Sequence, residues 1–336
     1  IALMVSRGSS MLLESIGQLK NIDRKKENWL CFVCGIVAGI AFGFNGFFWS
    51  QAVIVEVYTF SVLSFALVLC LLLRWMYAPQ QRRFLYWAFF LFGISFTNHQ
   101  TLIVGAMGIQ VAIMLAQPKL GRDLFLANTI IFFVGLWAKA TDRISSFDPS
   151  PVVNALGQSV LKTNPLYVIY LLIGIGSMIT CVWLVINTQK ILTEWRAVLL
   201  SGLMFILGAS FYFYMPLASM TNPPLNWGYP RTAEGFVHAF TRGQYEKTKP
   251  TDSIGRLADQ VAMYAESAAE EFTVVYVLIA LVPFFFLRRM QSRERAWIIG
   301  LSAIWLFLAL LLMVLLNPST DKQSRDLTKV FFTASY

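Results

Sequence analysis

Long runs of apolar residues, separated by short polar segments, make up most of the chain. A helix that crosses a bilayer needs about 20 apolar residues, because its backbone groups find no water to bond there. Runs of about this length lie at Trp29–Phe48, Ala52–Leu73, Leu124–Lys139, Leu166–Asn187, Ala197–Pro216, Phe272–Leu287 and Trp297–Leu316. Residues 1–5 read as the tail of an earlier span, and residues 11–19 predict an interfacial helix. The pattern predicts an all-α, multi-pass integral membrane protein.

The run Phe84–Gln117 is too long for a single crossing. At about 1.5 Å per residue it would be roughly 51 Å long, well beyond the hydrocarbon thickness. Its middle, Thr97–Thr101, is polar, and basic residues stand before and after the run. We therefore predict a hairpin of two short helices, 84–97 and 100–117, with the polar apex on the side opposite to its basic ends.

The basic residues support this hairpin, because it places the short basic loops on the same side of the membrane. With the hairpin in place, the short basic segments share one side, and they lie at 20–26, 74–83, 119–122, 190–196 and 288–295. Basic short loops face the cytoplasm. The other side then carries the corner 48–56, the apex 98–99, the loop 140–165 and a larger loop 217–271. A single crossing would invert every loop after residue 117.

The larger loop, residues 217–271, contains two predicted helices. Thr232 can cap a helix that runs to Arg242, with Gly243 as its stop signal. Further along, apolar residues at helical spacing from Ile254 to Tyr264 predict an amphipathic helix on the membrane surface. Elsewhere, the repeat Gly35, Gly39 and Gly43 predicts a close contact between two helices.

Composition excludes several classes of protein. Apolar residues make up 57% of the chain and charged residues only 13%, so a soluble globule is excluded and membrane lipids are expected partners. The net charge of +9 follows membrane sidedness, so no nucleic acid is predicted. Cys31 and Cys34 form a C-x-x-C, but within an apolar helix and without a second pair they predict packing rather than a metal site.

Glu56 is the ionisable residue that most strongly indicates a site. It lies in the otherwise uncharged stretch 47–73, about one helical turn from the extracytoplasmic surface. A charged side chain at that depth is costly and usually marks a functional site. The alternative is an interfacial carboxylate bonded to a neighbouring helix end.

The predicted apex and the larger loop supply further candidates. Asn98 and His99 either belong to the site or simply satisfy the polar groups of a turn. In the larger loop, aromatic rings offer flat faces for sugars and arginines offer clamps for phosphate, against the alternative of an interfacial turn with aromatic anchors. The candidates there are Trp227, Tyr229, Arg231, Arg242 and Tyr245.

Three strings together resemble one known family. They are Phe48-Trp-Ser-Gln-Ala-Val-Ile-Val-Glu-Val-Tyr58, Thr97-Asn-His-Gln-Thr101, and the segment from Asn226-Trp-Gly to Gln244-Tyr245. The family is the transmembrane-protein-260 type of protein O-mannosyltransferase, whose bacterial relatives have long been labelled a domain of unknown function. The resemblance implies a GT-C helical fold, an active site at the extracytoplasmic face, a polyprenyl-phosphate sugar as donor, inversion at the anomeric carbon, and, for a bacterial member, the inner membrane.

Matching by position carries over a set of residues from this family. They are Trp49, Gln51, Glu56, Tyr58, Asn98, His99, Trp227, Gly228 and Tyr245. The family's acidic Asp-x-Gly-Glu motif, a natural place for the catalytic base, has no counterpart in the sequence. We therefore expect the chain to be a fragment that begins after the loop carrying this motif.

The combined hypothesis is a glycosyltransferase that moves a sugar, with mannose as the family's example, from the lipid donor to protein hydroxyls or envelope glycans. In this hypothesis Glu56, His99 and Asn98 serve catalysis. Substrate is bound by Trp49, Gln51, Tyr58, Trp227, Arg231, Arg242 and Tyr245, without a metal. The alternatives are a flippase for lipid-linked saccharides, which predicts polar residues near the midplane of several spans, and a non-catalytic scaffold subunit.

Overall fold

The structure is a computed structural model of the 336-residue chain, and it describes all residues except 16–21, 55–56, 154–158, 227, 244–248 and 336. Within these described residues, seven helical segments are long and apolar enough to cross a membrane. They are Arg24–Gly43, Tyr58–Tyr77, Pro118–Ala140, Pro165–Thr188, Trp195–Met220, Ile254–Arg289 and Ser292–Leu316. The prediction of an all-α, multi-pass membrane protein is confirmed.

The chain forms two compact units, each built from segments that are distant in sequence. Unit 1 consists of residues 1–103, 199–248 and 328–336, and unit 2 of residues 104–198 and 249–327. The helices of unit 1 are α1 (Ala2–Ser15), α2 (Arg24–Gly43), α3 (Gly46–Val53), α4 (Tyr58–Tyr77), α5 (Arg83–Asn98), most of α9 (Trp195–Ala209), η3 (Ser210–Phe213), α10 (Tyr214–Met220), α11 (Ala233–Phe240) and η6 (Val330–Phe332).

Unit 2 contains the remaining elements and the short antiparallel strands β1 (Ser150–Val153) and β2 (Ser159–Lys162), in which Ser150 pairs with Lys162. Its helices are α6 (Ala106–Ala116), α7 (Pro118–Ala140), η2 (Ser145–Phe147), α8 (Pro165–Thr188), α12 (Ile254–Phe286), η4 (Leu287–Arg289), α13 (Ser292–Leu306), the π-helical turn η5 (Phe307–Leu311) and α14 (Leu312–Leu316). Among the described residues, three elements cross the boundary between the units: η1 (Gln100–Gly105), the first residues of α9 and α15 (Lys322–Lys329).

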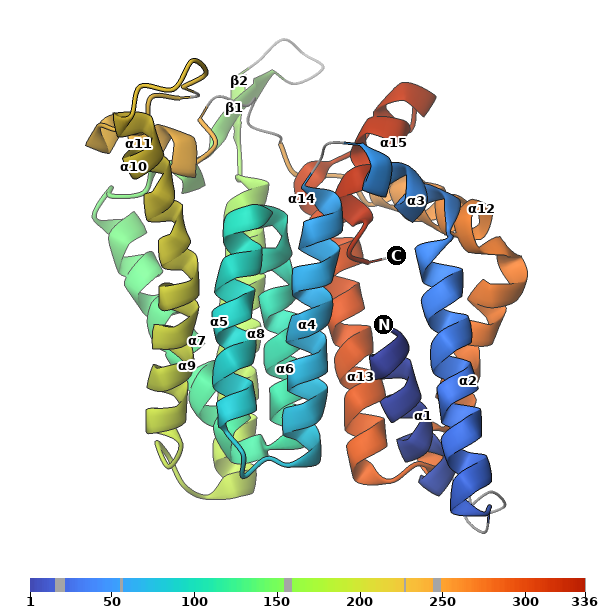
Figure 1. Cartoon of the computed structure of the whole chain (residues 1–336). Helices are drawn as coiled ribbons and strands as arrows, with labels where there is room; N and C mark the ends of the chain where they lie inside the picture. Colours follow the sequence, from blue (N-terminus) through green and yellow to red (C-terminus); the bar gives the residue numbers. More distant parts are fainter. Residues whose placement is uncertain (16–21, 55–56, 154–158, 227, 244–248, 336) are drawn as a thin grey trace. The chain divides into compact units, whose positions relative to one another are not determined.

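Glycines allow helices to approach closely within unit 1. α1 lies along α2 (Figure 1), and a Cβ added at Gly35 would stand 2.6 Å from the carbonyl oxygen of Ala2. Gly39 also faces Ala2, whereas Gly43 faces open space, so two of the three predicted glycines make the contact. α1 also joins residues 2–5 and 11–15, which the sequence divides into a span and an interfacial helix, into one helix. A second close contact joins α5 and α9, where Gly93 meets the backbone of Phe205 and Ala209.

Asn45 interrupts the apolar run that begins at Trp29. Its side chain accepts hydrogen bonds from the amides of Phe47 at 3.1 Å and Phe48 at 3.2 Å, which caps a new helix. α2 therefore ends at Gly43, and α3 is a separate helix before α4. The predicted boundaries 29–48 and 52–73 place these breaks differently, because an apolar run alone does not reveal a capping side chain.

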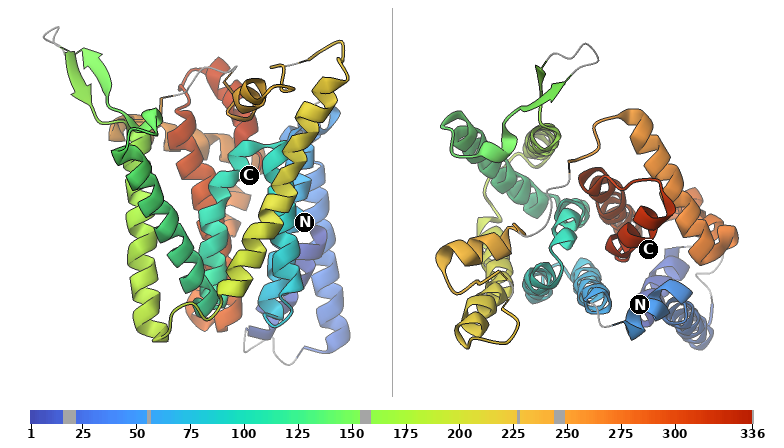
Figure 2. Two further views of the ribbon diagram at one scale, coloured as in Figure 1. Left: turned by 90° about the vertical axis from the view of Figure 1, so that its left-hand side faces the viewer. Right: turned by 90° about the horizontal axis from the view of Figure 1, so that it is seen from above.

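In unit 2, α7 and α8 run side by side and carry the β1–β2 pair at one end (Figure 2). The ring of Phe132 packs against Gly174 of α8, where a Cβ would collide with it. The hydroxyl of Tyr170 donates a hydrogen bond to the carbonyl of Phe132. α6 packs on α13 in the same manner, because a Cβ at Gly300 would stand 2.6 Å from that of Ala112. Small residues thus set the helix contacts in both units.

A buried ion pair fixes the start of α7. Arg122 and Asp123 are 0% and 2% exposed, and the guanidinium Nε donates to the Asp123 carboxylate at 2.7 Å. The remaining Arg122 nitrogens donate to Thr188, Thr193 and the carbonyl of Lys190. Asp123 also accepts from the amides of residues 192 and 194, at 3.2 and 2.6 Å. Arg122, read from the sequence as a loop cation, is therefore paired inside unit 2.

α12 changes direction at Thr273, whose φ of 59° and ψ of 152° are not helical (Figure 1). Before this residue, Gln260 donates to Asn317 at 3.0 Å and to the carbonyl of Pro318 at 2.9 Å, which ties α12 to the end of α14. Tyr264, predicted on a membrane-surface face, is instead buried and accepts a hydrogen bond from Trp305. After Thr273 the helix exposes apolar side chains.

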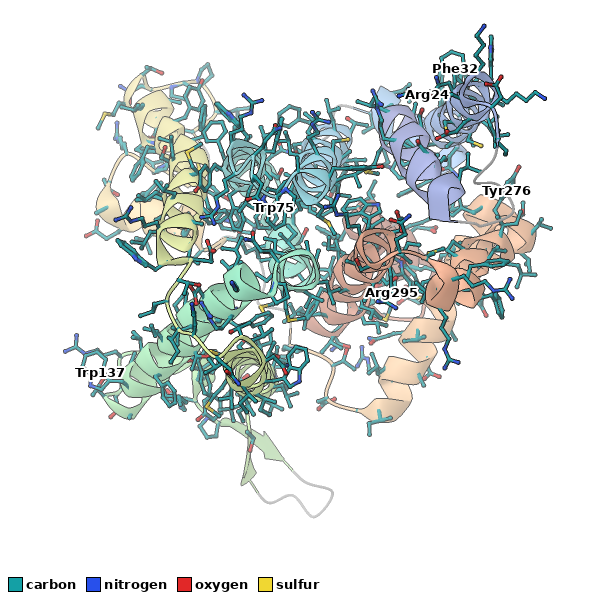
Figure 3. All side chains as sticks on the ribbon, turned by 90° about the horizontal axis from the view of Figure 1, so that it is seen from below. Arg24, Phe32, Trp75, Trp137, Tyr276 and Arg295 are labelled. Carbon is teal, nitrogen blue, oxygen red and sulfur yellow. The ribbon has the colours of Figure 1, made fainter. Side chains whose placement is uncertain are left out.

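Aromatic side chains divide between the interior and the surface. In Figure 3, Phe32, Trp137 and Tyr276 project away from their helices, and they are 54%, 58% and 63% exposed. Trp75 of α4 is fully buried. Large apolar residues exposed along helices of this length match a lipid environment.

Candidate functional site

The polar residues at the end of α5 form the candidate site in unit 1. α5 begins at Arg83 and ends at Asn98, and His99 leaves the helix with a φ of −143° and a ψ of 100°. The amide of His99 still donates to the carbonyl of Ser95 at 2.9 Å. The long run 84–117 is therefore broken at its polar middle, where η1 follows. That its halves form a membrane hairpin stays a prediction.

Asn98 connects the end of α5 to the start of α4. Its amide nitrogen donates to the carbonyl of Val57 at 3.1 Å and to the hydroxyl of Ser61 at 2.6 Å. Ser61 in turn donates to the same carbonyl at 2.8 Å. Both amide protons are thus engaged, so the side chain has a fixed orientation and acts here as a support for its neighbours.

His99 lies at the centre of the cluster and is 4% exposed. Its Nδ1 is 2.7 Å from the hydroxyl of Thr101. Tyr58 meets the imidazole edge to face, with centroids 5.4 Å apart, and Phe331 stacks on it at 5.8 Å and 15°. Nε2 is buried and has no hydrogen-bond partner within the described part of the chain. Such an atom is rare in folded proteins and calls for a physical reason.

The protonation state of His99 follows from this environment. Burial lowers the pKa of His99 from 6.5 to about 4, and the positive charge of Arg242 acts in the same direction. The ring is therefore neutral at neutral pH. A neutral imidazole has one donor and one acceptor nitrogen, so Nε2 offers a single hydrogen bond whose direction depends on the bond between Nδ1 and Thr101.

α3 contributes Gln51 and Trp49 from the neighbouring corner. Gln51 is 7% exposed, so its amide is held inside unit 1. Trp49 is 55% exposed and stacks on Phe44 with centroids 5.5 Å apart. Gln51 is thus buried, whereas Trp49 offers an open aromatic face.

The segment around α11 joins the site through Gln100 and a group of aromatic rings. Gln100 donates to the carbonyl of Phe240 at 2.8 Å, and the Phe240 ring packs on Phe96 and Tyr212. As predicted, Thr232 caps α11, since its hydroxyl accepts from the amide of Gly235 at 3.0 Å. This packing brings half-buried Arg242 near enough to affect His99.

Arg231 has its contacts within its own loop. It donates to Asn222 at 2.7 Å, and its guanidinium lies 4.8 Å from the ring centre of Tyr229. Of the two predicted phosphate ligands, Arg242 is therefore the one that acts electrostatically on His99. Glu56, Trp227 and Tyr245 lie outside the described residues.

Sequence reasoning did not find Phe331, Phe240 or Ser61. Ser61 lies in a predicted span, Phe240 in the predicted loop helix and Phe331 beyond the last predicted span, and each reaches the cluster through a contact distant in sequence. No local motif could have indicated them. Among the described residues, no group of three acidic, histidine or cysteine side chains is placed to hold a metal ion.

Comparison with known proteins gives one match. Residues 2–121 match the family described as Protein O-mannosyl-transferase TMEM260 N-terminal domain. The matched segment includes Trp49, Gln51, Tyr58, Asn98 and His99. No curated protein and no solved structure matches the chain.

Proposed function

We infer the function from one premise, that residues 2–121 belong to the TMEM260 N-terminal domain family of protein O-mannosyl-transferases. This family and the membrane-spanning helices indicate a membrane glycosyltransferase. We propose further that the enzyme has the GT-C fold, uses a polyprenyl-phosphate sugar and transfers the sugar, with mannose as the first candidate, to protein hydroxyls or envelope glycans. The reaction would take place at the extracytoplasmic face with inversion.

The observation that carries this proposal is the buried Nε2 of His99, which has no hydrogen-bond partner among the described residues. A buried polar atom without a partner costs about 1–3 kcal/mol, and a bound substrate is one of the partners that can remove this cost. The atom lies within the family match, and Arg242 is close enough to influence its ring. A hydroxyl of the substrate would satisfy Nε2, and a phosphate oxygen would satisfy it and also place negative charge near Arg242.

The chemistry assigns roles to these residues. In inverting transfer, an acceptor hydroxyl attacks the anomeric carbon, its proton passes to a carboxylate, and the bond to the lipid phosphate breaks. Cations and hydrogen-bond donors stabilise the departing phosphate. We propose Arg242 for that phosphate, with Arg231 as the second candidate, and Glu56 to orient the acceptor or the base. Trp227, Tyr245 and Trp49 would pack on sugar or lipid. Gln51, Tyr58 and Asn98 would line the substrate site beside His99 and hold its side chains in place.

Deletion of the gene tests this function through the masses of intact glycopeptides from envelope proteins. We expect hexose-sized increments on Ser or Thr to disappear and to return with the parent gene or a lipid-facing control, Ile131→Val on α7, whose side chain is 66% exposed. Complementation with His99→Ala should fail to restore them. Unchanged glycopeptides would overturn the proposal, and accumulated lipid-linked saccharide would point to a flippase instead.

A further inference from the structure

Residues 328–335 form a compact segment of unit 1. Lys329 ends α15, and the apolar residues 330–332 turn immediately into the 3-10 helix η6. Phe332 and Thr333 are 3% and 5% exposed, and the amide of Ser335 donates to the carbonyl of Phe332 at 2.8 Å. The segment is therefore packed into unit 1.

Phe331 places this segment against the candidate site. Its ring stacks on His99 at 5.8 Å and 15°, and it meets Tyr58 edge to face at 6.3 Å and 87°. The ammonium of the neighbouring Lys329 lies 5.0 Å from the ring centre of Phe47 on α3. One short segment thus contacts α3, the start of α4 and the residue that follows α5.

These contacts account for the orientation of His99. Tyr58 contacts one part of the ring, Thr101 fixes Nδ1, and Phe331 lies nearly parallel to the imidazole plane. A ring bonded through one nitrogen can still tilt about that bond. A parallel aromatic ring opposes this tilt, because tilting would separate the two stacked faces.

We propose that Phe331 is a positioning residue, whose ring holds the imidazole of His99 in the orientation that keeps Nε2 available to the substrate and shields that ring from water. The proposal rests on the proposed function for its catalytic meaning. Its structural part, the shielding and orientation of His99, can be measured without any substrate.

Chemical modification tests the structural part directly. Diethyl pyrocarbonate acylates neutral imidazoles that it can reach, and the chain has two histidines, His99 and the exposed His238, which serves as an internal reference. In the purified full-length protein, we expect His99 to react at least tenfold more slowly than His238. Phe331→Leu should raise the rate at His99 severalfold, whereas Phe331→Tyr, which preserves the stack, should leave it near the parent value.

Control variants separate this effect from general unfolding. Phe285→Leu makes the same chemical change at a lipid-facing position that is 83% exposed, and it should not alter the reactivity of His99. An unchanged melting temperature of Phe331→Leu shows that the fold is retained, and an unchanged rate at His238 shows that the reagent is equally active in both samples. The proposal is wrong if Phe331→Leu leaves His99 protected, or if His99 in the parent protein reacts as fast as His238.

Activity provides the second readout. Phe331→Leu should lower the transfer rate about threefold to tenfold, and Phe331→Tyr should restore it. The acid limb of the pH profile should also move upward, because water admitted to His99 favours its protonated form. Among the described residues, Tyr58 contacts the ring and the positive charge of Arg242 acts on it, while Lys329 faces Phe47; Glu56 lies outside the described residues. If the parent protein transfers no sugar, the proposed function fails while the modification experiment still decides the role of Phe331.

Discussion

At the scale of single residues, the polar side chains of the site differ in whether their hydrogen bonds are already made within the protein. Asn98 donates its amide hydrogen bonds to Val57 and Ser61, so it holds α4 and α5 together. His99 is 4% exposed, and its Nε2 has no partner within the part of the chain that the structure describes. The sequence identified both residues by their polarity between apolar helices, but it could not distinguish support from contact with substrate, because that depends on partners more than 35 residues away.

His99 makes the stability of the protein depend on pH. Its pKa is about 4 in the folded chain and about 6.5 when unfolded, so the unfolded chain binds more protons between these values. Stability is therefore fully present above pH 6.5 and falls as the pH approaches 4. Between pH 7 and pH 5 the loss should be about 2 kcal/mol.

Thermal unfolding of the detergent-purified protein at pH 7 and pH 5 measures this loss. His99→Gln removes the titrating ring and should reduce the difference between the two pH values. An equal difference in parent and variant would assign the pH dependence to other groups.

At the scale of helices, close contacts depend on which glycine faces a neighbour. Gly93 of α5 meets the backbone of α9, whereas Gly202 of α9 has open space around its added Cβ. Gly93→Ala should destabilise unit 1 by about 1–3 kcal/mol through overpacking. Gly202→Ala, the matched control, should be neutral or stabilise by up to about 1 kcal/mol, because alanine favours the helix.

Melting temperatures of the two alanine variants in the same detergent compare these positions. Equal melting temperatures would mean that α5 and α9 do not approach as closely as the structure shows. The sequence shows both glycines, but it does not show which of them another helix covers.

The pair Arg122–Asp123 is the strongest local constraint at the start of α7. Asp123→Ala leaves a fully buried guanidinium without its carboxylate, which should cost about 3–5 kcal/mol. The double variant Arg122→Met, Asp123→Leu removes both charges and should regain much of that loss. Asp23, which is exposed, provides the control substitution Asp23→Ala with little effect.

Folded yield and melting temperature report on all three variants. An Asp123→Ala variant as stable as the parent would contradict the buried pair. From the sequence alone Arg122 counts among the loop cations, because a charge count gives no information about burial.

At the scale of the whole molecule, apolar length predicted the spanning helices well, and their ends less well. The ends depend on the capping side chain of Asn45 and on the non-helical backbone of Thr273. A hydropathy pattern averaged over many residues does not show such single positions. The cluster around His99 was predicted in part, since its residues before position 102 carry polar signals. Nothing in the sequence around Phe331 indicates a role in the site, because only folding brings its ring against His99.

Sidedness is testable in intact cells with single cysteines in a background without Cys31, Cys34, Cys70 and Cys181. The predicted hairpin places Asp142 outside and Gln189 inside. Asp142→Cys should therefore react with a membrane-impermeant maleimide, and Gln189→Cys should react only after the cells are opened. The reverse result would mean that residues 84–117 cross the membrane once.

The network around Arg122 also bears on the order in which the protein is made. Its partners Thr188, Lys190 and Thr193 are synthesised more than 60 residues after Arg122 itself. In the predicted topology Arg122 lies on the cytoplasmic side, and until the ribosome has released these partners we expect it to stay there as a hydrated cation. Only then can the charge be buried, so biosynthesis must complete α8 before α7 reaches its final place.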